Sequence, residues 1–297
     1  MEIFRGQNLL EFAVRFDTDE KCMEYLSEIK WGKAYICKKC KHKQCQIRKD
    51  YSRICNICST IETATSSTLF HKLKFGLRKA FFICFEMATT SKGLSALQIS
   101  VRFGIGVRTS RMFMQKIREA MKSSGNFPMT GIVHVDEFVV GGYEQGKQGR
   151  SYDSKKKKAI CAVELAPEGK VKRFYAFKID DYSAKSLKKM FAKHIDKHAT
   201  VTTDKWKGYN PITKEYNITQ VLSNKGANFK ALHTMIHQIK TWVRTTYSWV
   251  DEKNIDRYFD EFCYRINRSQ SKDTIFDNLI KRMVKADNIS HKEIVGN

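Results

Sequence analysis

Residues 132–140 read IVHVDEFVV, and this stretch decides the fold that we predict for the larger part of the chain. It has a β-strand pattern, rich in valine and isoleucine, with Asp136 and Glu137 embedded in it. An acid in a strand is costly to bury unless it is paired or binds a cation. We therefore expect a chemical reason for an acid at this position.

The segments that follow predict two more antiparallel strands, a helix, and then a strand that pairs beside the first. The expected ranges are strands at 159–165 and 174–179, a helix at 183–194 and a strand at 199–204. This is the element order of an RNase H-like mixed sheet, so the predicted fold class is α/β. In that fold Asp136 and Asp204 come from neighbouring strands, where they can share divalent ions, and hard oxygen ligands suit Mg²⁺. Aspartates at strand ends also serve as caps or turn formers, so that alternative stays open.

Upstream of the strands, four cysteines have the spacing C-x2-C-x14-C-x2-C, at Cys37, Cys40, Cys55 and Cys58. Two such knuckles can place four thiolates tetrahedrally around one zinc ion. We therefore predict a small structural zinc ribbon, in which the metal supplies folding free energy on the order of 10 kcal/mol. Cys45 and His42 lie inside the loop as poorer substitute ligands, and four cysteines without metal are the alternative.

The chain between the ribbon and the first strand predicts helices from residue 69 onward. Ser95 is placed to cap a short helix, Gly104 and Gly106 to form a turn, and Thr109 to begin a second helix, which together predict a helix-turn-helix. An ordinary helical hairpin with a solvated basic face is the alternative. The side chains expected to face outward from the second helix, toward phosphates or base edges, are Arg108, Arg111, Gln115, Lys116 and Arg118.

The charge balance indicates a polyanionic partner. The chain of 297 residues has 54 Lys+Arg against 31 Asp+Glu, a net charge of +23, and nucleic acid is the commonest polyanion for such a protein. No secretory signal or apolar stretch of about 18 residues is evident, so we expect a cytoplasmic, nucleoid-associated protein without membrane contact. The basic residues expected to contact DNA near the acids are Lys147, Arg150, Lys155, Lys156, Lys157, Lys158, Lys205 and Lys207, with a solvated lysine run as the alternative for any one of them.

Five stretches carry a resemblance to a known family. They are CKKC…CNIC, HVDEFVVGG, TTDKWKGY, LHTMIHQIKTWVR and YFDEFCYRINR, in this order between residues 12 and 268. In them the chain resembles the transposases of bacterial insertion sequences that join a zinc ribbon to a DDE-type RNase H-like domain, the ISXO-type group. The resemblance implies divalent-metal-dependent DNA cleavage and strand transfer at the terminal inverted repeats of the element. It also implies that Asp136 and Asp204 are the first two catalytic acids.

The third catalytic position departs from the best-known pattern, because the chain has His237 where a glutamate is usual, with Lys240 following one turn later. Residues at i and i+3 share a helix face, so both side chains are expected to point at the scissile phosphate. We expect His237 to be the third metal ligand or a proton-transfer group. Since imidazole is neutral and softer than carboxylate, Mn²⁺ is then expected to support activity better than Mg²⁺. A histidine of the surface or core is the alternative.

Two further acids compete with these positions. Glu137 follows Asp136 directly, so strand alternation is expected to point it to the opposite face, away from a shared metal. Glu261 lies on a predicted helix and is expected to pair with Arg265 at i+4 instead of binding metal.

These observations predict a multidomain chain. The expected regions are an N-terminal helix and zinc ribbon at 1–68, a helical DNA-binding region at 69–125, the catalytic domain at 130–270 and a C-terminal helical tail at 271–297. The leading hypothesis is a transposase that binds double-stranded DNA, both transposon ends and target, as a homodimer or higher oligomer, with structural Zn²⁺ and catalytic Mg²⁺ or Mn²⁺. A DNA-binding regulator with an inactive nuclease core, and an RNase H-like repair nuclease, are the alternatives.

Overall fold

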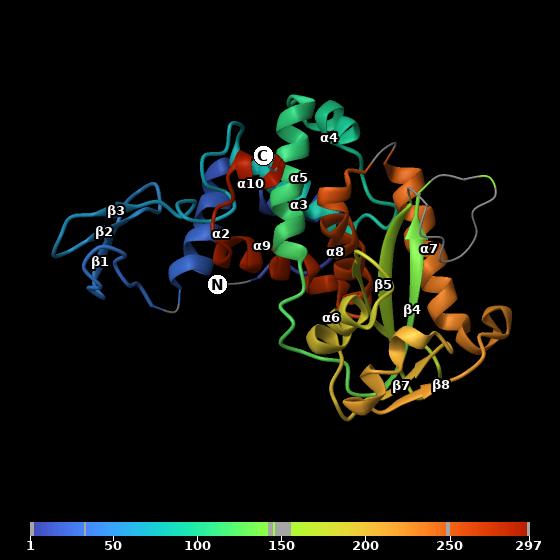
Figure 1. The fold of residues 1–297 in the computed structure, drawn as a ribbon. Helices are drawn as coiled ribbons and strands as arrows, with labels where there is room; N and C mark the ends of the chain where they lie inside the picture. The colour runs from blue at the N-terminus through green and yellow to red at the C-terminus, as the bar shows by residue number, and fades with distance from the viewer. Residues whose placement is uncertain (1–2, 33, 142–144, 146–155, 248–249, 296–297) are drawn as a thin grey trace. The chain divides into compact units, whose positions relative to one another are not determined.

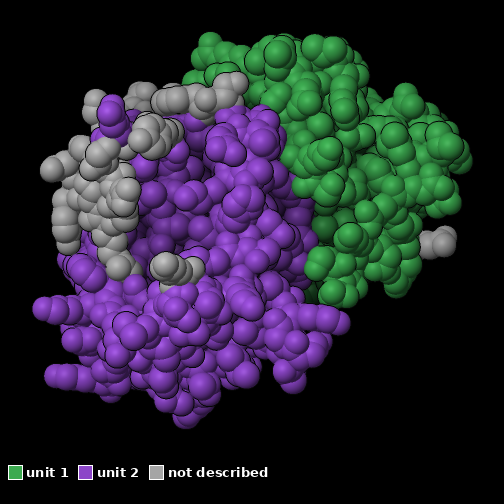
Figure 2. Space-filling model, turned by 90° about the vertical axis from the view of Figure 1, so that its right-hand side faces the viewer, with its two compact units in different colours: residues 1–121, 268–297 green, residues 122–267 purple. Residues whose placement is uncertain are grey.

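The computed structural model of the protein describes residues 3–32, 34–141, 145, 156–247 and 250–295. The chain forms two compact units. Unit 1 comprises Met1–Met121 and Arg268–Asn297, and unit 2 comprises Lys122–Asn267 (Figure 2). No helix in the described part of the chain is long and apolar enough to cross a membrane.

Unit 2 is built on a five-stranded sheet (Figure 1). Its strands are β4 (Ile132–Val140), β5 (Lys157–Leu165), β6 (Val171–Lys178), β7 (Thr200–Thr203) and β8 (Ile218–Gln220). The order is β6-β5-β4-β7-β8; β5 is antiparallel to both of its neighbours, β4 and β6, whereas β7 runs parallel to β4 and β8 parallel to β7. This mixed order confirms the predicted RNase H-like fold. The main difference in bounds is β6, which begins at Val171, three residues before the predicted strand.

Helices cover both faces of this sheet (Figure 1). One face packs on α6 (Ala184–His194) and the short helices η1 (Lys207–Tyr209) and η2 (Ile212–Lys214). The other packs on α7 (Lys230–Thr246) and α8 (Ile255–Ile266), which follow η3 (Asn224–Phe229) and η4 (Glu252–Asn254). Strand alternation divides β4 between the two cores, because Val133 and Val135 enter the first and Phe138 and Val140 the second.

A buried ion pair holds the segment that leads into β4. Glu164 on β5 is fully buried, and its carboxylate accepts hydrogen bonds from Arg173 on β6 and from the backbone N–H groups of Thr130 and Gly131. The Arg173 guanidinium also donates to the carbonyl oxygens of residues 127 and 128. One carboxylate thereby fixes the start of the strand that carries Asp136.

Unit 1 contains the cysteine-rich segment and a set of helices (Figure 1). Its elements are α1 (Leu9–Arg15), α2 (Asp19–Trp31), the antiparallel strands β1 (Cys45–Ile47), β2 (Arg53–Cys55) and β3 (Ile61–Glu62), then α3 (Leu77–Thr89), α4 (Ala96–Phe103), α5 (Val107–Met121), η5 (Lys272–Thr274), α9 (Ile275–Lys285) and α10 (His291–Val295). Phenylalanines from distant parts of the chain meet in its core, where the ring of Phe276 on α9 lies 4.9 Å from that of Phe12 on α1. The Tyr25 hydroxyl donates to Asp277 Oδ1 at 2.7 Å, so the end of the chain is an integral part of this unit.

The helix pair α4–α5 has the local signals that the sequence suggested. Ser95 and Gln98 form a capping box at the start of α4, and Gly104 ends it in the left-handed conformation at φ 58°. The second helix begins at Val107, two residues earlier than predicted.

Candidate active site and zinc site

The acids of the predicted catalytic site lie where β4 and β7 run parallel. The register pairs Ile132 with Thr200 and Val135 with Thr203, so Asp136 and Asp204 are each the next residue on adjacent parallel chains. One carboxylate oxygen from each of Asp136, Glu137 and Asp204 lies within 4.8 Å of the others. The pairing of neighbouring strands that the sequence suggested therefore brings the two aspartates together, and in the structure this pairing is parallel.

The expectation that Glu137 points away from the shared site is wrong, because its carboxylate belongs to this group. Alternation fixes the direction of the Cα–Cβ bond only, and a glutamate carboxylate lies two bonds beyond Cβ. The two acids are also linked locally, since the Glu137 backbone N–H donates to Asp136 Oδ1 at 2.8 Å. Burial, and next the charge of Glu137, raise the pKa of the fully buried Tyr209, so its hydroxyl stays protonated beside the acids.

Helix α7 contributes a histidine that the sequence analysis did not single out. His233 Nε2 lies 3.5 Å from Asp136 Oδ2, and this carboxylate raises the pKa of His233. The imidazole also packs on the backbone at Gly226, where a Cβ atom would lie 2.9 Å from His233 Nδ1. Gly226 has φ +89°, a conformation that favours glycine. A signal for this residue was present, since LHTMIH places two histidines four apart on one helix face.

The two α7 residues of the predicted site lie further along the same helix. His237 and Lys240 are exposed, and their spacing of four and seven residues from His233 places all three on one face. Partial burial, and then the charges of Lys156 and Arg244, lower the pKa of Lys240. This end of α7 is therefore close to other cations.

The basic residues predicted to contact DNA near the acids differ in their exposure to solvent. Lys205 and Lys207 directly follow Asp204 and are exposed, while Lys156, Lys157 and Lys158, at the start of β5, are half-buried. The loop between Asp204 and η1 is held by Trp206, whose backbone N–H donates to Asp204 Oδ1 and whose indole donates to Tyr182 O. The remaining three, Lys147, Arg150 and Lys155, lie outside the described residues.

Glu261 takes the structural role that the sequence suggested. It is fully buried on α8, with Arg265 Nη2 3.7 Å from its Oε1. The Tyr247 hydroxyl donates to the other carboxylate oxygen at 3.3 Å. This confirms the predicted i+4 pair.

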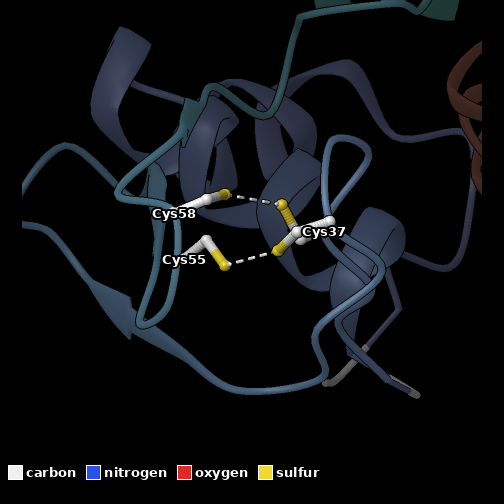
Figure 3. A group of neighbouring side chains, drawn as sticks. Cys37, Cys55 and Cys58 are labelled. Carbon is white, nitrogen blue, oxygen red and sulfur yellow. Dashed lines mark hydrogen bonds between the residues drawn. The ribbon is translucent and has the colours of Figure 1, made fainter.

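In unit 1 the four cysteines of the two knuckles converge. Figure 3 shows the side chains of Cys37, Cys55 and Cys58 directed toward one another, and Cys40 completes the group. The Sγ–Sγ distance is 3.5 Å for Cys37 and Cys58 and 3.4 Å for Cys40 and Cys55. A tetrahedral zinc ion with Zn–S bonds of about 2.3 Å requires about 3.8 Å between sulfurs, so the group fits zinc with slight expansion. Hydrogen bonding with Thr60, through its side chain and its backbone, lowers the pKa of the Cys58 thiol to about 6, which favours the thiolate that a metal needs.

The outward-facing set predicted for α5 is partly wrong. Gln115 and Arg118 are buried, the latter at 1% exposure, because this part of the helix packs inside unit 1. Arg108 and Arg111 are exposed, as expected, and Lys116 is half-buried. The basic surface of α5 is therefore concentrated toward its N-terminal half.

Comparison with known proteins gives one family. Residues 128–267 match the family model described as the ISXO2-like transposase domain. Among solved structures, the Mos1 strand transfer complex is similar at 9% identity, covering 65% of this chain and 78% of that chain with a TM-score of 0.23. The Mos1 transposase paired-end complex with left transposon end is similar at 10% identity, covering 70% and 80% with a TM-score of 0.21. No curated protein matches the sequence.

Proposed function

We propose that this chain is a transposase that cleaves DNA at the ends of an insertion sequence and joins them to target DNA. The match of residues 128–267 to the ISXO2-like transposase domain family supports this proposal. In this proposal it recognises the terminal inverted repeats, uses a divalent metal for cleavage, and pairs two ends as a homodimer or higher oligomer. The group of Asp136, Glu137 and Asp204 is the observation that supports the chemistry.

The chemistry of this group favours a hard divalent cation. Three carboxylates within 4.8 Å of one another repel when ionised, and a bound cation offsets that repulsion. All three offer oxygen, which suits Mg²⁺ or Mn²⁺ better than a thiophilic metal. When bound, such ions would supply Lewis acidity that activates the attacking hydroxyl and stabilises the leaving oxygen of a phosphodiester.

We assign the remaining roles in this proposal to three residues of α7. His233 beside Asp136 orients that carboxylate and holds a proton at Nε2 toward it. His237 and Lys240 lie further along the same face and are exposed, so we assign them to the scissile phosphate. The lysine supplies positive charge there, and the imidazole supplies proton transfer or a third ligand.

DNA binding is assigned to three cationic parts of the chain. The zinc ribbon and the α4–α5 pair hold the transposon end, with Arg108, Arg111 and Lys116 on α5. The lysines around the acids, at 156–158, 205 and 207, hold the strand that is cleaved, as we also propose for Lys147, Arg150 and Lys155. Because these contacts neutralise phosphates, the affinity should fall steeply with salt, by about 0.9 log units per log unit of salt for each one.

A strand-transfer assay tests the proposal. The full-length protein is incubated with a labelled double-stranded transposon end, a target plasmid and Mg²⁺ or Mn²⁺. We expect joined products from the wild type and none from Asp136→Asn or Asp204→Asn, while Asp180→Asn, an exposed aspartate of unit 2, keeps activity. Hydrolysis without joining would instead indicate a repair nuclease, and DNA binding without any product an inactive regulator.

A further inference from the structure

Unit 1 contains a cavity of about 680 Å³ that is separate from the acids and from the zinc cysteines. Its walls come from residues 71–75 before α3, from one side of α5 and from residues 288–291, where α10 begins. The size lies within the range of about 300–1,000 Å³ that is typical of small-ligand sites.

The cavity is cationic. The described residues that line it include four lysines or arginines and two histidines, and no aspartate or glutamate. Lys116 is half-buried, and its ammonium donates to His71 O at 3.4 Å and to Asn288 Oδ1 at 3.0 Å. Both acceptors are uncharged, and within the described part of unit 1 no carboxylate forms an ion pair with Lys116. A half-buried ammonium without a counter-charge favours the binding of an anion.

The other side of the cavity is apolar and partly aromatic. Phe75 and Met112 are half-buried and line it together with the buried Phe113, whose ring meets Phe75 edge-on at 5.2 Å. Arg108 is exposed, and its Nη2 lies 3.2 Å from His291 Nε2. A guanidinium and an ammonium near an aromatic wall suit a ligand that has both a phosphate and a flat ring.

We propose that this cavity binds one unpaired nucleotide of a DNA strand. Its phosphate lies between Arg108 and Lys116, and its base lies against Phe75 and Met112. A base within duplex DNA stays stacked on its neighbours, so it cannot occupy the apolar wall while its phosphate reaches Lys116. The inference rests on the proposed DNA binding of this chain and narrows it to a single-stranded segment held by unit 1.

The test measures binding of a fluorescein-labelled oligothymidylate of about ten nucleotides to the full-length protein by anisotropy at low salt. We expect Lys116→Met to weaken binding on the order of tenfold and to lower the salt slope by about 1. Phe75→Leu should lower the affinity for the oligothymidylate by about fivefold or more while changing the affinity for duplex DNA little. Lys79→Met, which removes one exposed charge of α3 outside the cavity, is the matched control.

Two further arms distinguish the sources of binding. An oligothymidylate carrying 5-iodouracil should photo-crosslink within residues 71–75 or 108–116, which peptide mapping locates even where a substitution perturbs folding. Inorganic phosphate should compete only weakly. A crosslink elsewhere, equal effects of Lys116→Met and Lys79→Met, or phosphate competing as well as the oligonucleotide would overturn the proposal. Asp136→Asn should leave this binding intact, so loss of cleavage and loss of the nucleotide site are separate outcomes.

Discussion

His233 Nε2 lies 3.5 Å from Asp136 Oδ2, whereas His237, one turn further along α7, is exposed. The contact joins the helix to the first acid of the site. Under the proposed function it implies different effects for the two histidines, because His233 would orient a carboxylate that binds the metal and His237 would face the DNA.

We predict that His233→Ala lowers the apparent metal affinity, so that the midpoint of the metal titration of cleavage rises by about 10–100-fold. Loss of a residue that orients a metal ligand commonly has an effect of this size. His237→Ala is expected to slow cleavage at saturating metal without moving the midpoint of the metal titration. Titrating Mg²⁺ and Mn²⁺ in the cleavage assay measures both quantities. A shifted midpoint in His237→Ala alone, with Mn²⁺ preferred by the wild type, would instead make His237 the third ligand.

Glu137 is predicted to be a metal ligand in its own right, since its carboxylate lies within 4.8 Å of those of Asp136 and Asp204. Glu137→Gln should weaken Mn²⁺ binding by at least the roughly 10–100-fold that loss of an outer-shell partner costs. Glu168→Gln, at an exposed position in the turn between β5 and β6, removes the same charge and should change nothing. Water-proton relaxation reports Mn²⁺ binding directly, and equal affinity in both variants would exclude Glu137 from the site.

The sheet could be predicted because its strands carry strong local patterns. The apolar run around Asp136 and the short strand before Asp204 indicate two buried neighbours. The connection between them, two strands and then α6, is long enough for the parallel pairing that the structure has. The place of Glu137 could not be predicted the same way, because alternation says where Cβ points and not where a long side chain ends. The position of His233 beside Asp136 depends on how α7 packs against β4, which no local sequence pattern specifies.

Unit 1 shows a second limit of prediction from sequence, which concerns the packing of distant segments. Phe276 and Asp277 on α9 pack against residues near the start of the chain, a separation of more than two hundred positions. Amphipathic periodicity predicts that α9 is a helix but not which core it joins. For the same reason Arg118 on α5 reads as a solvent-facing cation in the sequence and is buried in the structure.

Zinc binding is predicted to depend on the four knuckle cysteines and not on Cys45, which lies outside the sulfur group. Cys58→Ser should lose the metal and destabilise the ribbon, because the metal supplies most of its folding free energy. Cys45→Ser is the matched control and should retain one zinc ion per chain. Metal analysis of the purified variants, with hydrogen exchange of β1 and β2, measures both effects, and zinc retained by Cys58→Ser would contradict the assignment.

The buried pair of Glu164 and Arg173 predicts a pH dependence of stability. Burial alone would raise the pKa of Glu164, but the hydrogen bond and charge of Arg173 outweigh it and lower that pKa below the ordinary 4.5. A carboxyl group with a lowered pKa stabilises the fold above its unfolded pKa, and this stability is lost as pH falls through the folded value. The free energy of unfolding of unit 2 should therefore fall below about pH 5.

Glu164→Gln should destabilise unit 2 at neutral pH by about 1.5–3 kcal/mol, the value of hydrogen bonds to a charged group. It should also reduce the loss of unfolding free energy that the wild type shows at acidic pH. Hydrogen exchange of β5 and β6 amides across pH, corrected for intrinsic rates, gives the local free energy. Glu168→Gln should follow the wild type. If the free energy of unfolding of Glu164→Gln falls at acidic pH as it does in the wild type, another carboxylate is responsible for that fall.

Gly226 is predicted to set the position of His233. An alanine there would place Cβ 2.9 Å from His233 Nδ1, and φ +89° adds backbone strain. Gly169 offers a matched control, because it has φ +79° and open space where a Cβ atom would lie. Both alanine variants should lose about 1–2 kcal/mol of stability from the left-handed backbone, but only Gly226→Ala displaces the imidazole. We therefore expect Gly226→Ala to reproduce the metal-dependence defect of His233→Ala while Gly169→Ala cleaves DNA normally. Equal activity of the two glycine variants would show that the site tolerates a moved His233, and would remove the argument that this histidine orients Asp136.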